Sequence, residues 1–151
     1  MKTVRYFAAI VCLVLVSASA YAQKSTLPKN ILNTLEKKCP GAEDVQWKVK
    51  SKGDYEIKFK LNGNKTEVEI DEDGTWEKTT THISVDELPK AVRATVMEQK
   101  KDAEISELKV IVTNDDETYY RVNLKDGNGR TKLKIDKKGK ITSSEVKKKE
   151  K

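Results

Sequence analysis

Hydrophobic and polar residues alternate along most of the chain, with two different periods. Leu27, Ile31 and Leu35 recur at three- to four-residue spacing, which places them on one face of a helix. From residue 45 onward the hydrophobic residues recur at every second position instead, and Asn62-Gly63 is typical of a two-residue turn. This pattern predicts a helix followed by an antiparallel meander that is buried on one face and wetted on the other.

The Asn62-Gly63 turn also predicts how its two strands pair. It sets Ile57 opposite Val68 on the buried face, and Lys58 opposite Glu67 on the wet face. An opposite-charge pair of this kind contributes about 0.2–1 kcal/mol. The register therefore depends on the buried pairs more than on the exposed ion pair.

The whole pattern occurs twice. Leu27-Pro28-Lys29 recurs 61 residues later as Leu88-Pro89-Lys90, and Ile70-Asp71 recurs 65 residues later as Ile135-Asp136. The change of offset places a four-residue insertion within residues 113–118, between the first two strands of the second copy. We therefore expect a tandem duplication of a helix plus an antiparallel meander.

The repeat divides the mature chain into residues 23–83 and residues 84–151, the second ending in a basic tail. A unit of about 60 residues is small for an independent core, and no Gly- or Pro-rich linker separates the two. Ser84 and Glu87 form a capping-box pattern before the second helix. We expect one composite α+β domain, a two-layer α/β sandwich in which the two apolar sides merge into a single interior.

Residues 1–22 have the composition of a secretory signal peptide. Lys2 and Arg5 precede an apolar stretch, and Ala20-Tyr21-Ala22 is an A-x-A cleavage signal before Gln23. The apolar stretch is short for a bilayer span, and an uncleaved anchor helix is the alternative. We expect cleavage between Ala22 and Gln23, export to a bacterial periplasm, and no transmembrane segment in the mature chain.

Few residues could carry catalysis. His82 is the only His, and Cys39 is the only Cys beyond the signal peptide, so a nucleophile–base pair would need these two. Cys39 is either a small buried hydrophobe or a thiol for an intermolecular disulfide. Asp71 and Asp73 precede a Gly as in a calcium loop, but further oxygen ligands are missing. We therefore expect no enzyme, no metal and no cofactor.

Charge distinguishes the two units. The chain has 30 basic and 24 acidic residues. Basic and acidic side chains balance within residues 23–83, and the second unit carries an excess of basic ones. Nucleic acid is disfavoured by export, by the balancing acids and by the lack of aromatic residues for stacking. The candidate partner-binding residues, which share the wet face of the second unit, are Tyr119, Arg121, Lys125, Lys132 and Lys134.

Several short motifs stand at matching places in the two units. They are Leu27-Pro28, Pro40-Gly41-Ala42, Tyr55-Glu56-Ile57 and Ile70-Asp71-Glu72-Asp73-Gly74, with Leu88-Pro89, Tyr120-Arg121-Val122 and Ile135-Asp136-Lys137-Lys138-Gly139 in the second unit. Together they resemble the PepSY-like, beta-lactamase-inhibitor-protein-like periplasmic proteins of Bacteroides-type bacteria. Lys101-Asp102 departs from the Pro-Gly turn. The resemblance implies an α+β fold whose C-terminal strands can be exchanged between units, and it implies no established catalytic motif.

These observations predict an exported, non-enzymatic module that binds another envelope protein or peptide, inhibitor-like, through its open sheet face. The alternatives are an enzyme or an envelope protein that binds a metal or small ligand, using His82, Cys39 or Asp71 and Asp73, and a structural envelope component. Fold resemblance alone does not choose among them.

Overall fold

The computed structural model describes residues 27–149, so the expected signal peptide, residues 1–22, lies outside the described residues. The elements follow one another as α1 (Lys29–Lys38), β1 (Glu43–Val49), β2 (Tyr55–Leu61), β3 (Asn64–Ile70), β4 (Trp76–His82), the 3₁₀ helix η2 (Val85–Glu87), α2 (Lys90–Lys100), β5 (Glu104–Thr113), β6 (Thr118–Asp126), β7 (Gly129–Asp136) and β8 (Ile141–Lys148). We call residues 27–83 the first half and residues 84–149 the second half.

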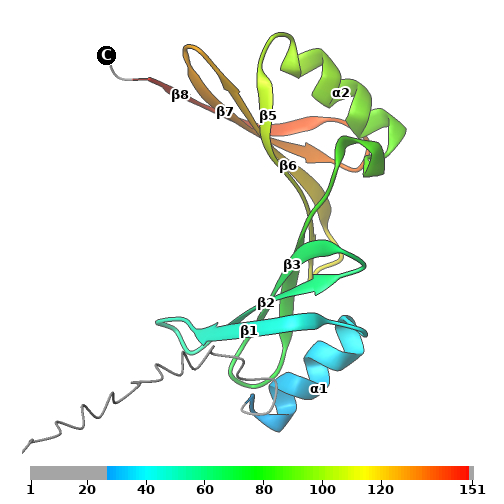
Figure 1. The fold of residues 1–151 in the computed structure, drawn as a ribbon, viewed down its shortest axis with the longest axis vertical. Coiled ribbons are helices and arrows are strands. Elements are labelled where there is room, and N and C mark those ends of the chain that lie inside the picture. Colours follow the sequence, from blue (N-terminus) through cyan, green and yellow to red (C-terminus); the bar gives the residue numbers. More distant parts are fainter. Residues whose placement is uncertain (1–26, 150–151) are drawn as a thin grey trace, which may run out of the picture.

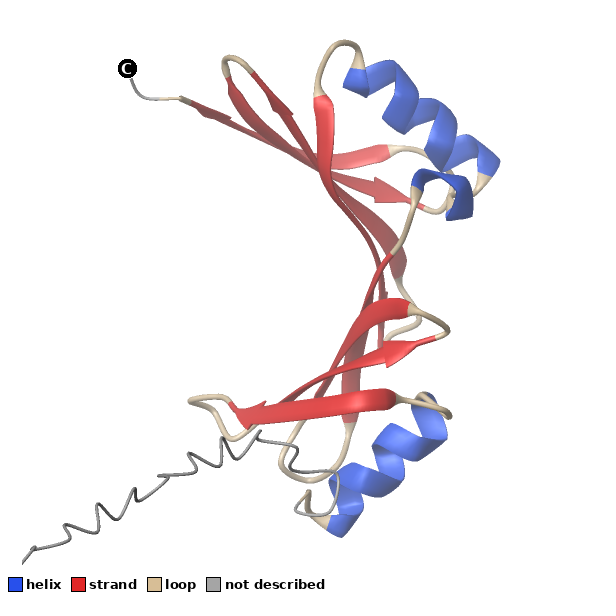
Figure 2. Cartoon of the chain, viewed as in Figure 1, coloured by secondary structure: helices blue, strands red, loops and turns tan. Residues whose placement is uncertain are grey.

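The strands form one antiparallel eight-stranded sheet in sequence order, from β1 to β8. This confirms the α+β fold. Because β8 pairs with β7, the described strands show no exchange between the halves, contrary to what the resemblance allowed. The sheet is bent into a C, with α1 and α2 on its convex side and no helix in its concavity (Figures 1 and 2).

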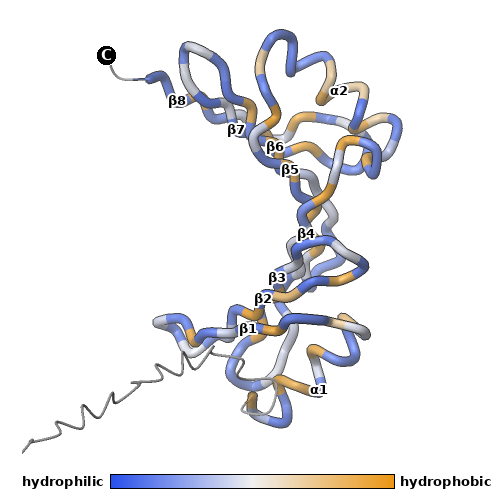
Figure 3. The backbone as a smooth tube through the Cα atoms, viewed as in Figure 1, coloured by the Kyte–Doolittle hydropathy of each residue, from blue (hydrophilic) through white to orange (hydrophobic). Residues whose placement is uncertain are grey.

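The expected register of the first hairpin is confirmed. Ile57 lies opposite Val68, Lys58 lies opposite Glu67, and the hairpin closes at the Asn62-Gly63 turn. The alternation of hydrophobic and hydrophilic positions can be followed along the strands in Figure 3. Ile57 and Val68 are fully buried beneath α1, and Lys58 is exposed, so the period-2 pattern assigned the faces correctly.

The hydrophobic core is in two parts, so the expected single interior is wrong. The cluster under α1 comprises Leu27, Ile31, Leu35, Cys39, Ile57, Phe59, Val68 and Ile70. The cluster under α2 comprises Leu88, Val92, Val96, Leu108, Tyr120, Val122, Leu124, Leu133 and Ile135.

Threonines on β4 separate these clusters. Thr79 lies between Val68 of β3 and Val112 of β5, and Thr81 lies between Thr66 and Val110. The Thr79 hydroxyl accepts a hydrogen bond from the Trp76 indole at 2.9 Å. Because the hydroxyls of Thr79 and Thr81 find hydrogen-bond partners, β4 is stable without a continuous apolar layer over it. The halves therefore share a sheet but keep separate cores.

The same side-chain contact ties each helix to its own half. Thr34 on α1 donates a hydrogen bond to the Gly74 carbonyl at 2.6 Å, and Thr95 on α2 donates one to the Gly139 carbonyl at 2.7 Å. Gly139 has φ +85°, and a Cβ there would lie 2.7 Å from the Ala91 carbonyl oxygen. Glycine is needed here for backbone conformation and for close approach of the helix.

Replacing Gly139 by Ala should destabilise the protein more than the same change at Gly63, which has a similar φ of +81° but open space around its Cβ position. Gly63→Ala should cost about 1–2 kcal/mol from the left-handed conformation alone. Gly139→Ala adds a backbone clash worth about 1–3 kcal/mol. Urea unfolding of both variants measures the difference, and equal costs would contradict the close helix–turn contact.

Candidate functional site

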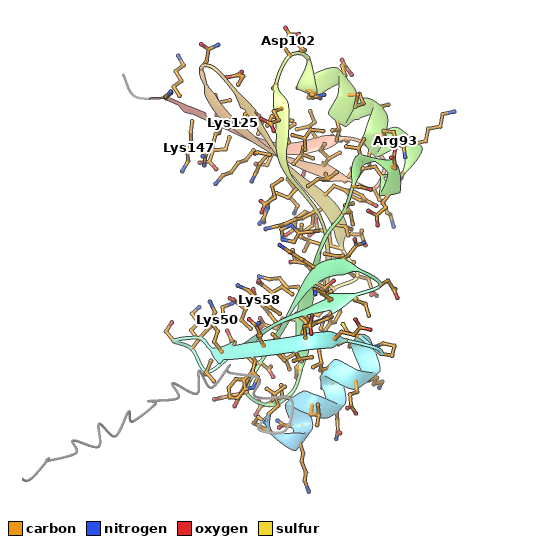
Figure 4. All side chains as sticks on the ribbon, in the orientation of Figure 1. Lys50, Lys58, Arg93, Asp102, Lys125 and Lys147 are labelled. Carbon is orange, nitrogen blue, oxygen red and sulfur yellow. The ribbon has the colours of Figure 1, made fainter. Side chains whose placement is uncertain are left out.

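The concave side of the sheet, which we call the open face, carries the side chains that point away from both helices. Figure 4 shows Lys50 and Lys58 from the first half, and Lys125 and Lys147 from the second, projecting into the concavity, whereas Arg93, a residue of α2, lies on the other side. The open face is therefore rich in charged side chains along its whole length. The two halves differ in how those charges are compensated.

In the first half the charges form a closed network around two carboxylates. The Glu69 carboxylate forms ion pairs with the Lys50 ammonium at 2.7 Å and with the Lys78 ammonium at 2.8 Å. Glu56, directly opposite Glu69 on the neighbouring strand, receives Lys48 at 2.9 Å and Lys58 at 3.0 Å. Four lysines thus surround two carboxylates, and the like-charge pairing of the two Glu residues is neutralised.

This network keeps both carboxylates ionised. Partial burial raises the pKa of Glu69, but hydrogen bonds from Lys50 and Lys78 outweigh it and hold that pKa below the ordinary value of 4.5. The hydrogen bond from Lys48 lowers the pKa of Glu56 in the same direction, against a smaller effect of burial. Most charges in the first half of the open face are therefore paired within the chain. Lys65, which is exposed opposite Lys60, is the exception among the lysines on the described strands of this half.

In the second half the structure brings the five predicted residues together on one face. Arg121 on β6 lies opposite Lys134 on β7, and Lys132 lies two residues from Lys134 on the same face. Lys134 is held by Glu117 at 3.0 Å, and its Nζ lies 3.9 Å from the centre of the Tyr119 ring. Lys125 lies further along β6 on the same face.

Among the described residues, Arg121, Lys125 and Lys132 form no ion pair, and all three are exposed. Sequence reasoning missed a fourth such residue, Arg130, which lies directly opposite Lys125. Counting back at every second position from Lys132 would have found it. These four cations without counterions make the second half of the open face electropositive.

Ile111 is the other residue that sequence reasoning missed. It shares the open face with its register neighbours Thr80 and Tyr119, yet it is 2 % exposed and belongs to neither core cluster. The helices lie on the opposite side of the sheet, so the side chains of the open face itself must cover it. One buried apolar side chain therefore lies on the open face where the two halves of the sheet meet, beside the electropositive surface.

The candidate catalytic pair is not assembled. Cys39 is buried in the cluster under α1, whereas His82 lies on the open face opposite Lys109. Desolvation, followed by the charge of Lys109, lowers the pKa of His82 below 6.5. The two side chains are on opposite sides of the sheet, so they cannot act as nucleophile and base together.

Asp71 of the suspected calcium loop, and Asp136 at the corresponding position of the second half, accept hydrogen bonds within turns. Asp71 accepts a hydrogen bond from the Thr75 amide at 2.7 Å, and Asp136 accepts bonds from the amides of Lys138 and Lys140 at 2.8 and 3.0 Å. Within residues 27–149, no group of three or more His, Cys, Asp and Glu side chains is arranged to hold a metal ion. The same range contains no helix long and apolar enough to cross a membrane.

Glu69→Gln should weaken the dependence of stability on acid. Because the folded-state pKa is lowered, Glu69 stabilises the protein above the ordinary carboxyl value of 4.5, and this contribution is lost as pH falls through the folded-state pKa. The variant should lose about 1–2 kcal/mol at neutral pH, between the values for exposed and for buried ion pairs. Urea unfolding at neutral and acidic pH measures this.

The matched control is Glu67→Gln, since Glu67 is more exposed and has a single, longer contact of 3.6 Å with Lys58. It should change both the free energy of unfolding and its acid dependence less than Glu69→Gln does. If the two variants behaved alike, Glu69 would not anchor the network.

Cys39 should be protected from thiol reagents in the folded protein. Its side chain is 2 % exposed, and burial raises the pKa of its thiol above the ordinary value of 9.0. Reaction with a chromogenic disulfide should be at least about tenfold slower than in urea, because the reactive thiolate is scarce and enclosed. Cys39→Ala of the mature chain is the control, and rapid native reaction or disulfide-linked dimers would contradict this burial.

The fold is shared with solved structures from Bacteroides. A DUF2874 family protein from Bacteroides ovatus ATCC 8483 has a TM-score of 0.72 at 21 % identity, covering 80 % of this chain and 88 % of that one. A BLIP-like protein from Bacteroides fragilis NCTC 9343 has a TM-score of 0.72 at 23 % identity, covering 84 % and 92 %. A protein from Bacteroides eggerthii DSM 20697, described as a putative periplasmic protein, has a TM-score of 0.71 at 20 % identity, covering 79 % and 88 %.

No curated protein matches this chain. A family model described as "Putative beta-lactamase-inhibitor-like, PepSY-like" matches residues 53–143, more than half of the chain. That range runs from the end of the β1–β2 loop to the middle of β8, and it includes the entire electropositive surface. The chain therefore belongs to the PepSY-like family of putative beta-lactamase-inhibitor-like proteins.

Proposed function

We propose that this protein is an exported, non-enzymatic module that binds another envelope protein or peptide through the second half of its open face. The observation that carries the proposal is the contrast between two equivalent surfaces. In the first half Glu56 and Glu69 neutralise the neighbouring lysines, whereas the corresponding positions in the second half are Arg121 and Lys134. On the strands of the first surface one exposed cation, Lys65, forms no ion pair among the described residues, whereas the second surface has four such cations.

The chemistry of the surface supports binding more than catalysis. Exposed ion pairs contribute about 0.2–1 kcal/mol each, so unpaired surface cations add little to folding. They can instead speed association with a partner of opposite charge and select against the wrong partner. Tyr119, held at the edge of this surface by Lys134, adds an amphipathic ring of the type enriched in protein interfaces.

Export supports an envelope partner in particular. The signal-peptide pattern before Gln23, together with the description of a similar Bacteroides eggerthii protein as putatively periplasmic, favours the periplasm as the place of action. Within the chain, we place the boundary between the two repeats after residue 83, where β4 has ended and η2 has not begun. An inhibitory role is one form that such binding could take.

The direct test is recovery of partners from an envelope extract by the mature protein. The triple variant Arg121→Glu, Lys132→Glu, Lys134→Glu should reduce recovery about tenfold, since it reverses three charge contacts that each contribute up to about fivefold in affinity. The control reverses three exposed lysines away from this surface: Lys90→Glu, Lys137→Glu and Lys138→Glu.

A protein that is lost with the first variant and kept with the control should then be purified, and its binding to the mature chain should saturate at a fixed stoichiometry in calorimetry. Equal recovery by wild type and both variants would count against this surface.

A further inference from the structure

We propose that the partner contributes an extended acidic segment, with carboxylates at alternate positions, which lies along β6 and β7 on the open face. This inference rests on the proposed function and goes beyond it by naming the chemistry and conformation of what is bound. Three features of the second half support this inference. They are the spacing of the cations, their mutual repulsion, and the contacts that nearly all the neighbouring acidic residues already make within the chain.

The spacing of the cations matches an extended chain. Arg130, Lys132 and Lys134 occupy every second position of β7, and Arg121 and Lys125 occupy the facing row on β6. Side chains on one face of a strand recur at about 6.8 Å. A second extended segment laid along the strands has the same repeat, so its alternate carboxylates would meet successive cations. A helix, which advances about 5.4 Å per turn, would fall out of step.

The cations are also placed against one another. Lys125 lies directly opposite Arg130 across the β6–β7 pairing. Arg121 lies directly opposite Lys134 in the same way. Like charges in these positions destabilise a sheet. In the first half the equivalent pairing of Glu56 and Glu69 is relieved by four lysines of the same chain. In the second half only Lys134 has such relief, from Glu117, and a carboxylate from outside would relieve the rest.

Most acidic residues near these cations are already engaged. Glu107 holds Lys109 at 2.6 Å, and Glu145 holds Lys147 at 3.5 Å. Asp136 is used by the β7–β8 turn. Glu104 lies opposite Lys125 but forms no ion pair with it among the described residues. The surface therefore stays basic, while the strands of the first half offer an acidic segment one exposed cation without an ion pair among the described residues, Lys65.

The test uses the mature protein and two labelled synthetic decapeptides of identical composition. In one peptide Glu and Thr alternate, and in the other all Glu residues come first. Fluorescence anisotropy at low ionic strength should show the alternating peptide binding at least about threefold more tightly than the block isomer, because it places more carboxylates on one side at strand spacing. Added salt should weaken both interactions.

Four charge reversals on the open face, Arg121→Glu, Lys125→Glu, Arg130→Glu and Lys132→Glu, should weaken the alternating peptide at least about tenfold. The control with the same change of net charge, Lys29→Glu, Lys90→Glu, Lys137→Glu and Lys138→Glu, should weaken it less than about threefold, since these exposed lysines lie outside the surface. Neutral Gln variants at the four open-face positions relieve repulsion without adding charge, and they keep the test valid if the Glu variant fails to fold.

Equal loss in the open-face and control variants would overturn the inference, because only net charge would then matter. Equal binding of the two peptides would overturn the extended, alternating arrangement. Tighter binding of inorganic polyphosphate or anionic lipid vesicles, with displacement of the peptide, would also overturn the inference, because the surface would then bind a different kind of anion. A partner captured through the open face that does not compete with the alternating peptide would leave the proposed function standing and remove only this inference.

Discussion

The pairing of β4 with β5 is the interaction on which the arrangement of this protein depends. Lys78 to His82 pair with Lys109 to Thr113, and this ladder is what makes two four-stranded halves into one eight-stranded sheet. Each half has its own helix and its own core, so little else joins them. A hydrogen bond of 2.8 Å from Asn64 to Glu87 adds a second link on the helix side. Because the ladder is continuous, the open face is continuous too, and it bends into a concave surface.

The greater length of β5 extends this ladder. β5 has 10 residues where β1 has 7, and its additional length ends in Ile111, Val112 and Thr113, which pair with β4. The turn that follows returns to the first half, because the Asn114 amide donates to the Glu77 carbonyl at 2.8 Å. The same turn precedes Glu117, which holds Lys134. The longer β5 and the turn that follows it thus extend the contact between the halves and shape the edge of the basic surface.

The two halves use one scaffold with opposite electrostatic outcomes. In the first, acids at Glu56 and Glu69 are enclosed by lysines, which compensates most of the charge on that surface. In the second, Arg121 and Lys125 face other cations and are left without partners among the described residues. A protein that keeps repulsive pairs on an exposed surface sacrifices a little stability there, as binding surfaces commonly do. The scaffold is secured by its helix–turn contacts and buried strands, which are the same in both halves.

Local pattern was enough to determine the helices, the hairpin register and the side of the sheet on which Tyr119, Arg121, Lys125, Lys132 and Lys134 lie, because alternation and turn chemistry act over only a few residues. It could not decide how the halves meet. The small size of each unit made a merged apolar core the natural expectation. Thr79 and Thr81 lie instead where the two halves meet, and the halves are joined by pairing of β4 with β5 and not by packing of their cores. Which cations remain without a counterion, and that Ile111 is buried on the open face, depend on neighbours brought together by that pairing. Those contacts are long-range, so only the tertiary structure sets them.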